Sequence, residues 1–312
     1  MPPLSNSGRA WLQIHFCVLL WGFTAILGKL ITLESAPLVL WRMGLVATAL
    51  LLWPRAWRAM RELSAGLLWS YIAIGCVVAL HWLTFYGAIK LANASVAATC
   101  IATVPIFLAL IEPRLTNRRF RWWELALGLL AVPGIALLVG GTPDHMNMGI
   151  LVGISSAAFA ALFAALNKRL IMQAGALAVT TIEMSSGAIF LVLLYVVLML
   201  TGVSEVTGVF DAEQSLRPTL SDSMWLLILA FGCTLLPFAL SLMALRHLSA
   251  YASALAVNLE PVYAIILAII LLGEQAELEP RFYLGATLII GVILVYPRLL
   301  AQRPGASSRS NP

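Results

Sequence analysis

The sequence predicts an all-α integral membrane protein, in which ten transmembrane helices form two inverted-topology repeats of five helices each. Composition, a series of long apolar stretches and an internal repeat predict this fold class. Of the 312 residues, 61% are hydrophobic and only 11% are charged, and the mean hydropathy is +0.95. Soluble globular domains carry about 25% charged residues, so this composition excludes an ordinary soluble domain.

Ten stretches are apolar over enough residues to cross the roughly 30 Å hydrocarbon core of a bilayer as helices. They lie near Trp11–Ile31, Ala36–Pro54, Gly66–Lys90, Asn93–Leu115, Arg121–Gly141, Met148–Met172, Ala178–Thr201, Asp222–Arg246, Ala250–Leu272 and Glu279–Leu300. The first could instead be a signal peptide, but it is longer than a signal h-region and carries Lys29 near its end. No small-x-small cleavage motif follows it, so we expect a membrane helix there.

The four cysteines all fall inside these apolar stretches, without CxxC spacing and without a histidine at ligand distance. They are interpreted as small buried residues rather than disulfide partners or metal ligands. Neither a metal nor a cofactor is expected. The pI of about 9.2 does not call for a nucleic-acid partner, because the positive charge lies where a membrane protein of this topology would place it.

Lysines and arginines are divided unequally between the two sides of the membrane, which predicts the orientation by the positive-inside rule. If the N-terminus is cytoplasmic, fourteen of them lie inside: Arg9, Arg55, Arg58, Arg61, Arg114, Arg118, Arg119, Arg121, Lys168, Arg169, Arg246, Arg298, Arg303 and Arg309. Only four lie outside: Lys29, Lys90, Arg217 and Arg281. Both termini are therefore predicted to be cytoplasmic, and the polar tail 301–312 is predicted to be disordered.

The second half of the chain repeats the first at an offset of 156 residues, which pairs Ala88 with Ala244 and Pro105 with Pro261. A single match would be noise in so apolar a chain, but these occur in order together with others. Five helices are an odd number, so the second copy enters the membrane from the opposite side. Inverted repeats of this kind are common in secondary transporters.

Four motifs resemble the ten-helix EamA-type permeases of the drug/metabolite transporter (DMT) superfamily. They are "LLWGFTAILGKL" in the first predicted helix, "LVLWRMGLVA" in the second, "FYGAIKLANASVAA" from the third into the fourth, and "LEPVYAIILAIILLGE" in the ninth. The resemblance extends from Trp11 to Leu300 and implies one EamA-type repeat over 1–145 and another over 146–300. The first half departs from the pattern in one respect, since "TNRR" stands where the second half has Gly273–Glu274.

This resemblance implies a multi-pass transporter of the inner membrane, usually an exporter of small metabolites such as amino acids, sugars, nucleobases or drugs. Together with the inverted repeat, it predicts alternating access at the repeat interface, with protons as a candidate coupling ion. The expected partners are a small-molecule substrate and the lipid bilayer. Both a monomer and a homodimer remain open.

Glu260 and Pro261 stand in the middle of the ninth apolar stretch, where a carboxylate and a helix-breaking proline are both unfavourable. Pro261 should free backbone acceptors beside Glu260, which persist in a membrane only against protein or a water-filled cavity. We therefore expect a wet site at the repeat interface, where Glu260 is either a coupling residue or a structural hydrogen-bonding residue. Pro105 is its predicted counterpart, with Thr99 and Thr103 on a shared face and bonded to their own backbone.

Three further ionisable residues stand out within the predicted spans. Arg42 suits a substrate carboxylate or phosphate, or Glu260 as a structural partner, unless it snorkels to the outer surface. His81 suits either proton coupling or a hydrogen bond between helices. Glu183, near the cytoplasmic end of its span, suits an inner gate or a loop anchor.

Aromatic residues near mid-depth complete the candidate site. Trp21 and Trp82, with Tyr86 one turn beyond Trp82, either line a cavity for an aromatic or apolar substrate or pack helices together. Asn258 and Tyr263 flank Glu260 and are further candidates for substrate contact.

Motifs of intramembrane enzymes are absent from the sequence, which has no GxSxG, HExxH, GxGD, Walker A or paired metal carboxylates. We therefore expect no enzyme and no catalytic residues. The sequence also has no filter motif or rings of charge, which are typical of channels. A membrane channel and a non-transporting structural or regulatory subunit remain the alternative functions. Saturable, competable flux in sealed vesicles distinguishes a transporter from both.

Overall fold

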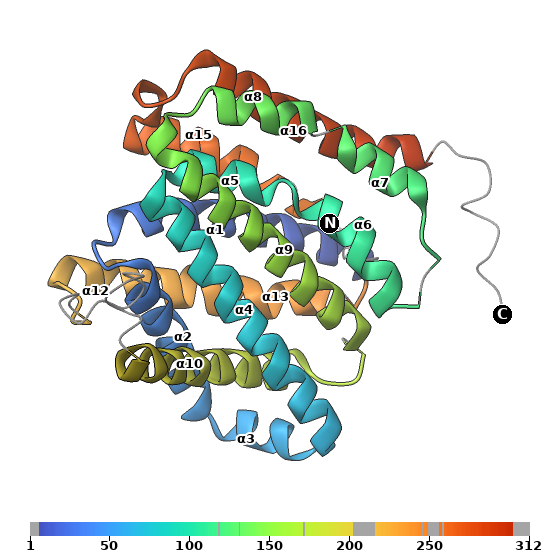
Figure 1. Cartoon of the computed structure of the whole chain (residues 1–312). Helices are drawn as coiled ribbons and strands as arrows, with labels where there is room; N and C mark the ends of the chain where they lie inside the picture. Colours follow the sequence, from blue (N-terminus) through green and yellow to red (C-terminus); the bar gives the residue numbers. More distant parts are fainter. Residues whose placement is uncertain are drawn as a thin grey trace, which may run out of the picture.

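The computed structural model describes residues 6–301, except 118, 131, 171, 202–215, 245, 249–255 and 258. All regular elements among these residues are helical, as the composition predicts. The predicted tail lies outside the described residues from position 302 onward. In Figure 1 the helices form one bundle, with α8, α7 and α16 along one edge and α3 and α10 toward the opposite edge.

The elements follow one another along the chain in two series. The first half contains α1 (Asn6–Leu30), α2 (Ser35–Leu51), α3 (Pro54–Arg61), α4 (Ala65–Leu91), α5 (Ala94–Ile101), α6 (Val104–Leu115), α7 (Trp122–Leu129) and α8 (Val132–Gly140). The second half contains α9 (Asn147–Leu170), α10 (Ala176–Thr201), α12 (Leu220–Leu227), a π-helical segment (Ile228–Leu235), α13 (Leu236–Ala244), α15 (Glu260–Leu272) and α16 (Pro280–Ala301).

Six helical segments among the described residues are long and apolar enough to cross a bilayer. They are Gly8–Leu30, Ala65–Leu91, Ala94–Leu115, Asp144–Leu170, Ala176–Thr201 and Leu220–Ala244. A seventh is added if α2 and α3, which meet at an angle of 87°, are counted as one broken span. A multi-pass membrane protein is therefore confirmed, and the count of ten spans stays a prediction.

Prolines explain where the helices begin anew. The fourth predicted span is divided into α5 and α6, and Pro105 stands in the first turn of α6. Pro261 likewise stands in the first turn of α15, which begins at Glu260, and the predicted start of this span at Ala250 lies outside the described residues. Pro54 opens α3 instead of ending the second span. Proline is tolerated in a first turn because the N–H group it lacks has no partner within the helix there.

Helices from the two halves pack against one another throughout the bundle. α4 lies against α9 and α10, α1 lies against α13 and α15, and α5 lies against α15. The contact between α5 and α15 brings together two helices that end or begin beside a helix break. α5 ends just before residues 102–103, and α15 begins at Glu260. α8 and α16 lie side by side at one edge of the bundle (Figure 1) and approach closely at two glycines. A Cβ atom on Gly134 would lie only 2.8 Å from the carbonyl oxygen of Gly285.

Two carboxylates of the second half bind backbone N–H groups of the first half. Glu274 is fully buried, and its Oε1 accepts from the Ala94 N–H at 3.0 Å. Its Oε2 accepts from the Ser95 N–H at 2.9 Å and from the Ser95 hydroxyl at 2.6 Å. Asp222 accepts from the N–H and the hydroxyl of Thr32, each at 2.7 Å. Glu274 needs no cation, because the N-terminus of α5 supplies both the donors and a partial positive charge.

The turns after α6 and α15 share one backbone feature. Asn117 has a φ of 52° and Gly273 has a φ of 70°, both in the left-handed region. These two residues are 156 positions apart, which is the offset of the internal repeat. The same left-handed turn therefore follows corresponding helices in both halves.

The face of α10 away from the bundle is apolar and exposed. Its exposed side chains include Ile189, Val192, Leu193, Val196, Val197 and Leu200. Large apolar side chains on this scale suit contact with lipid tails rather than water. The surface therefore agrees with a membrane environment.

Candidate functional site

Arg42 lies at the centre of a buried polar network between α2, α4 and the π-helical segment. Its side chain is 2% exposed. Nε donates to the Thr234 hydroxyl at 2.6 Å, Nη1 donates to the Tyr86 hydroxyl at 2.9 Å, and Nη2 donates to the Cys233 carbonyl at 3.5 Å. The alternative that Arg42 snorkels to the outer surface is therefore wrong, because neighbouring helices enclose its guanidinium group.

Two aromatic rings on α4 cover the faces of this cation. The guanidinium carbon of Arg42 lies 3.7 Å from the centre of the Trp82 ring and 5.6 Å from that of Tyr86. Trp82 and Tyr86 are four residues apart on α4, so they share one face of the helix. A desolvated cation–π contact is worth about 2 kcal/mol or more. Trp82 and Tyr86 thus hold Arg42 in place.

The π-helical segment explains why a carbonyl group is available to Arg42. The Thr234 hydroxyl donates to the carbonyl of Leu229, five residues earlier, at 2.7 Å. Pro237 lacks the N–H group that would meet the Cys233 carbonyl four residues before it. Such wider turns occur frequently at functional sites. Sequence reasoning missed this segment, although the proline in "CTLLP" was a signal for a freed acceptor.

Glu260 is half-buried at the first position of α15, with Pro261 next to it. It is close enough to Arg42 for the two charges to interact electrostatically. Within the described part of the chain, however, no ion pair or hydrogen bond joins these two side chains. The alternative in which Arg42 pairs directly with Glu260 is therefore not formed in this conformation. Asn258 lies outside the described residues.

Trp21 and Tyr263 lie apart from the polar network, in a second apolar cluster. Both are partly buried against residues of α1 and α13. α1 meets α15 here, because a Cβ atom on Gly22 would lie 2.9 Å from the Cβ of Tyr263. The hydroxyl of Thr24 donates to the Trp21 carbonyl at 2.6 Å. These two aromatic residues pack helices next to Glu260 rather than contacting Arg42.

His81 forms the predicted hydrogen bond between helices. Its Nδ1 lies 2.9 Å from the hydroxyl oxygen and 3.1 Å from the carbonyl oxygen of Ser156 on α9. The Ser156 hydroxyl also lies 2.9 Å from the His81 carbonyl oxygen, to which it can donate. Phe163 on α9 lies beside the imidazole, with ring centres 5.4 Å apart. A role of His81 in proton coupling stays a prediction.

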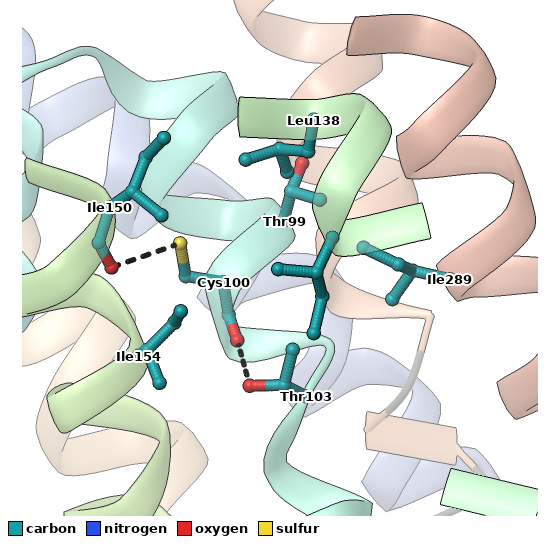
Figure 2. A pocket seen from close by; sticks show the side chains of 8 residues that line it. Thr99, Cys100, Thr103, Leu138, Ile150, Ile154 and Ile289 are labelled. Carbon is teal, nitrogen blue, oxygen red and sulfur yellow. Dashed lines mark hydrogen bonds between the residues drawn. The ribbon is translucent and has the colours of Figure 1, made fainter. Parts of the chain in front are cut away.

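A small apolar cavity lies beside the break between α5 and α6. Figure 2 shows Thr99, Cys100 and Thr103 facing Leu138, Ile150, Ile154 and Ile289. As predicted, both threonine hydroxyls bond to nearby backbone of their own segment, Thr99 to the Ser95 carbonyl at 2.8 Å and Thr103 to the Cys100 carbonyl at 2.6 Å. A volume of about 10 Å³ is near the minimum for one water molecule. This cavity is too small for a metabolite in the present conformation.

The described residues include neither a disulfide bond nor a cluster of side chains suited to a metal ion. The four cysteines are free, and Cys17, Cys100 and Cys233 are buried. The Cys17 thiol donates to the Pro237 carbonyl at 3.2 Å. Among the described residues, no group of three or more His, Cys, Asp or Glu side chains is placed to hold a metal ion.

The sequence profile of the EamA-like transporter family matches the chain twice, over residues 9–140 and 147–296. The chain belongs to the EamA-like transporter family. The double match agrees with the two-repeat architecture and makes the EamA-type chain a membrane transporter, which the motifs in its helices predict. The DMT-superfamily resemblance is thereby confirmed.

The fold of this EamA-type chain is also found in a crystal structure that is described only as that of a protein. The two share 17% sequence identity with a TM-score of 0.62, and the match covers 95% of this chain and 99% of that chain. At this identity the likeness concerns the fold alone. No curated protein matches the EamA-type chain.

Proposed function

We propose that the protein is a secondary active transporter that exports small metabolites by alternating access, with protons as the coupling ion. Substrates that carry a carboxylate, such as amino acids and related compounds, fit the polar network best. The observation that carries this proposal is the buried guanidinium group of Arg42, held between two repeats and stacked on Trp82.

Arg42 has donors to spare for an anionic group. A guanidinium group has five N–H donors, and three hydrogen bonds to described residues are formed by Nε, Nη1 and Nη2. The remaining donors can bind a carboxylate in the fork geometry that arginine favours. Tyr86 and Thr234 fix the orientation of the fork before substrate arrives, which reduces the entropy lost on binding.

Glu260 supplies the proposed coupling group. It stands at the start of a half-helix within the membrane, near the cation at the centre of the network. A carboxyl group that is enclosed in one conformation and reached by water in another can take up and release a proton. The interaction with Arg42 would weaken when Glu260 is protonated, which links proton binding to the state of the substrate site.

The proposed location is the inner membrane with both termini in the cytoplasm. The support is the distribution of lysine and arginine, with fourteen in the inner connections and four in the outer ones. Repeats over 1–145 and 146–300 would then enter the membrane from opposite sides, so that their interface can open to either side.

The test begins with metabolites measured inside and outside cells that contain or lack the protein. Compounds that accumulate outside are then followed in proteoliposomes under an imposed pH gradient. We expect saturable flux that a second substrate inhibits. Current without saturation would indicate a channel, and no flux from correctly inserted protein would indicate a non-transporting subunit.

A further inference from the structure

Glu183 and Asn167 form a buried polar pair away from the Arg42 network. Glu183 on α10 is 0% exposed and Asn167 on α9 is 4% exposed. Asn167 Nδ2 donates to Glu183 Oε2 at 3.4 Å. This hydrogen bond joins α9 to α10.

Close helix packing explains why water is excluded from this pair. Gly75 on α4 faces the backbone of α10, where a Cβ atom at Gly75 would lie 2.8 Å from the Cα of Glu183. One turn further along α10, a Cβ atom on Gly187 would lie 2.8 Å from the Gly75 carbonyl oxygen. Paired glycines bring membrane helices into backbone contact. Glu183 is therefore held in a tightly packed interior.

Two oxygens of the pair have no hydrogen-bond partner. They are Glu183 Oε1 and Asn167 Oδ1, and both are fully enclosed. An ionised carboxylate can only accept hydrogen bonds, and an amide oxygen is likewise an acceptor only. A hydrogen bond between Glu183 Oε1 and Asn167 Oδ1 therefore needs one more proton than the ionised pair contains.

No cation compensates for a charge on Glu183 among the described residues. Tyr71 on α4 donates to the Leu170 carbonyl at 2.9 Å, and Arg246 after α13 donates to the Ala174 carbonyl at 2.8 Å. The ionisable residues of α3, Arg55, Arg58 and Arg61, are exposed, and Arg42 on α2 is bound in its own network. On α9, Arg169 is exposed and Lys168 is partly exposed, and neither forms an ion pair with Glu183 in the described part of the chain. A buried, unpaired carboxylate costs several kcal/mol.

We propose that Glu183 is a proton-binding site and that its acid form makes a cyclic acid–amide pair with Asn167. One proton on Oε1 provides the missing hydrogen, which is donated to Asn167 Oδ1. The existing Nδ2–H bond to Oε2 closes the ring. A single proton therefore removes the charge and satisfies both unpartnered oxygens.

Loss of the proton replaces one of the two hydrogen bonds between α9 and α10 with repulsion between two oxygens. Thr180, one turn before Glu183 on α10, has a buried hydroxyl that is also without a partner. This hydroxyl can donate to the carboxylate after the proton has left. Proton release therefore loosens α9 from α10, whichever substrate the protein carries and whether or not Glu260 is a coupling residue.

Infrared difference spectroscopy tests the proposal on the purified full-length protein in lipid. We expect a carbonyl band of a protonated carboxyl group at neutral pH. Glu183→Gln should remove it, since the glutamine amide can form the same two hydrogen bonds and keep the fold. Glu260→Gln is the matched control and should retain the Glu183 band, whether or not the variant transports.

A second variant tests the hydrogen-bonding partner. Asn167→Leu should shift the frequency of the Glu183 band, because the acid then loses both bonds of the ring. An identical carboxyl region in wild-type protein and Glu183→Gln would overturn the proposal, and so would a Glu183 band that Asn167→Leu leaves unshifted. Neither outcome depends on flux, so the transport function is tested separately.

Discussion

The carboxylate of Glu274 and Ser95 are joined across 179 positions of the sequence, because the Ser95 N–H group and the Ser95 hydroxyl both donate to Glu274 Oε2. Glu274 Oε1 binds the neighbouring Ala94 N–H, so the carboxylate occupies the N-terminus of α5. Glu274 follows α15 of the second half, and α5 belongs to the first. This contact therefore links the two halves of the chain at the N-terminus of α5 and the C-terminus of α15.

Replacing Glu274 should release that fastening. Glu274→Ala leaves two buried N–H groups and a hydroxyl without a partner, each worth roughly 1–3 kcal/mol. We expect a lower melting temperature in detergent and a larger rate of cysteine labelling at position 95 in a Ser95→Cys background. Glu279→Gln, an exposed carboxylate nearby, should leave both unchanged. A melting temperature that is equal in Glu274→Ala and Glu279→Gln would contradict the fastening role.

Arg42 should tolerate no other cation if it binds substrate. Arg42→Lys retains the charge but loses the fork that contacts Thr234, Tyr86 and the Cys233 carbonyl. We expect flux to fall more than roughly tenfold, because hydrogen bonds to a charged group are worth about 1.5–3 kcal/mol each. Arg61→Lys on exposed α3 is the control and should transport normally. Normal flux in a well-expressed Arg42→Lys protein would exclude bidentate substrate binding.

Glu260→Gln separates titration from hydrogen bonding. The variant keeps the shape of the side chain but cannot exchange a proton, so it should fold and reach the membrane. We expect loss of pH-driven flux in proteoliposomes with substrate exchange retained. An unchanged pH profile would make Glu260 a structural residue, and the driving reaction would then be sought at His81.

Gly75 should be intolerant of even one added methyl group. A Cβ atom there would overlap the Glu183 backbone, whereas a Cβ atom on Gly66 of the same helix meets nothing within 4 Å. Overpacking a tight interface costs roughly 1–3 kcal/mol. Gly75→Ala should therefore lower the melting temperature, and Gly66→Ala should not. Equal melting temperatures for the two variants would show that α4 and α10 can separate freely.

The predicted orientation is tested with reporters at the two ends of the chain. A fluorescent reporter that matures only in the cytoplasm should be active at either terminus, and a phosphatase that requires the outer side should be inactive. Fusion of the phosphatase near Arg281, in a predicted outer connection, is the positive control. An active phosphatase at either terminus would refute the prediction that both termini are cytoplasmic.

Composition and the length of the apolar stretches were enough to predict the membrane class, because hydrophobic length is set directly by bilayer thickness. The family was predicted from the four motifs that resemble EamA-type permeases. Pro105 and Pro261 were predicted to interrupt their helices, but the form of each interruption was not predicted. Pro54, Pro105 and Pro261 were visible, but a proline within a membrane helix can kink it, end it or stand in a first turn. The choice depends on which neighbouring groups satisfy the freed backbone, and this requires tertiary contacts.

The candidate site was predicted in part. Arg42, Trp82 and Tyr86 were chosen for charge or depth, and the structure brings these three together. Thr234 and the Cys233 carbonyl were missed, since the π-helical turn that presents them has no pattern of its own beyond Pro237. Glu183 was predicted to be part of an inner gate or a loop anchor. Its pairing with Asn167 depends on close packing of α4 against α10 at Gly75, which the sequence alone does not reveal.

The shared left-handed turn after α6 and α15 has a consequence for how the two halves have diverged. The backbone shape persists at Asn117 and Gly273, and asparagine is among the few residues other than glycine that adopt it readily. The next residue is glutamate in one half and arginine, at position 118, in the other. An arginine cannot accept from backbone N–H groups, so only the second half can grip a helix N-terminus in this way. The two corresponding turns thus carry residues of opposite charge, so the contact made by Glu274 has no equivalent carboxylate after α6.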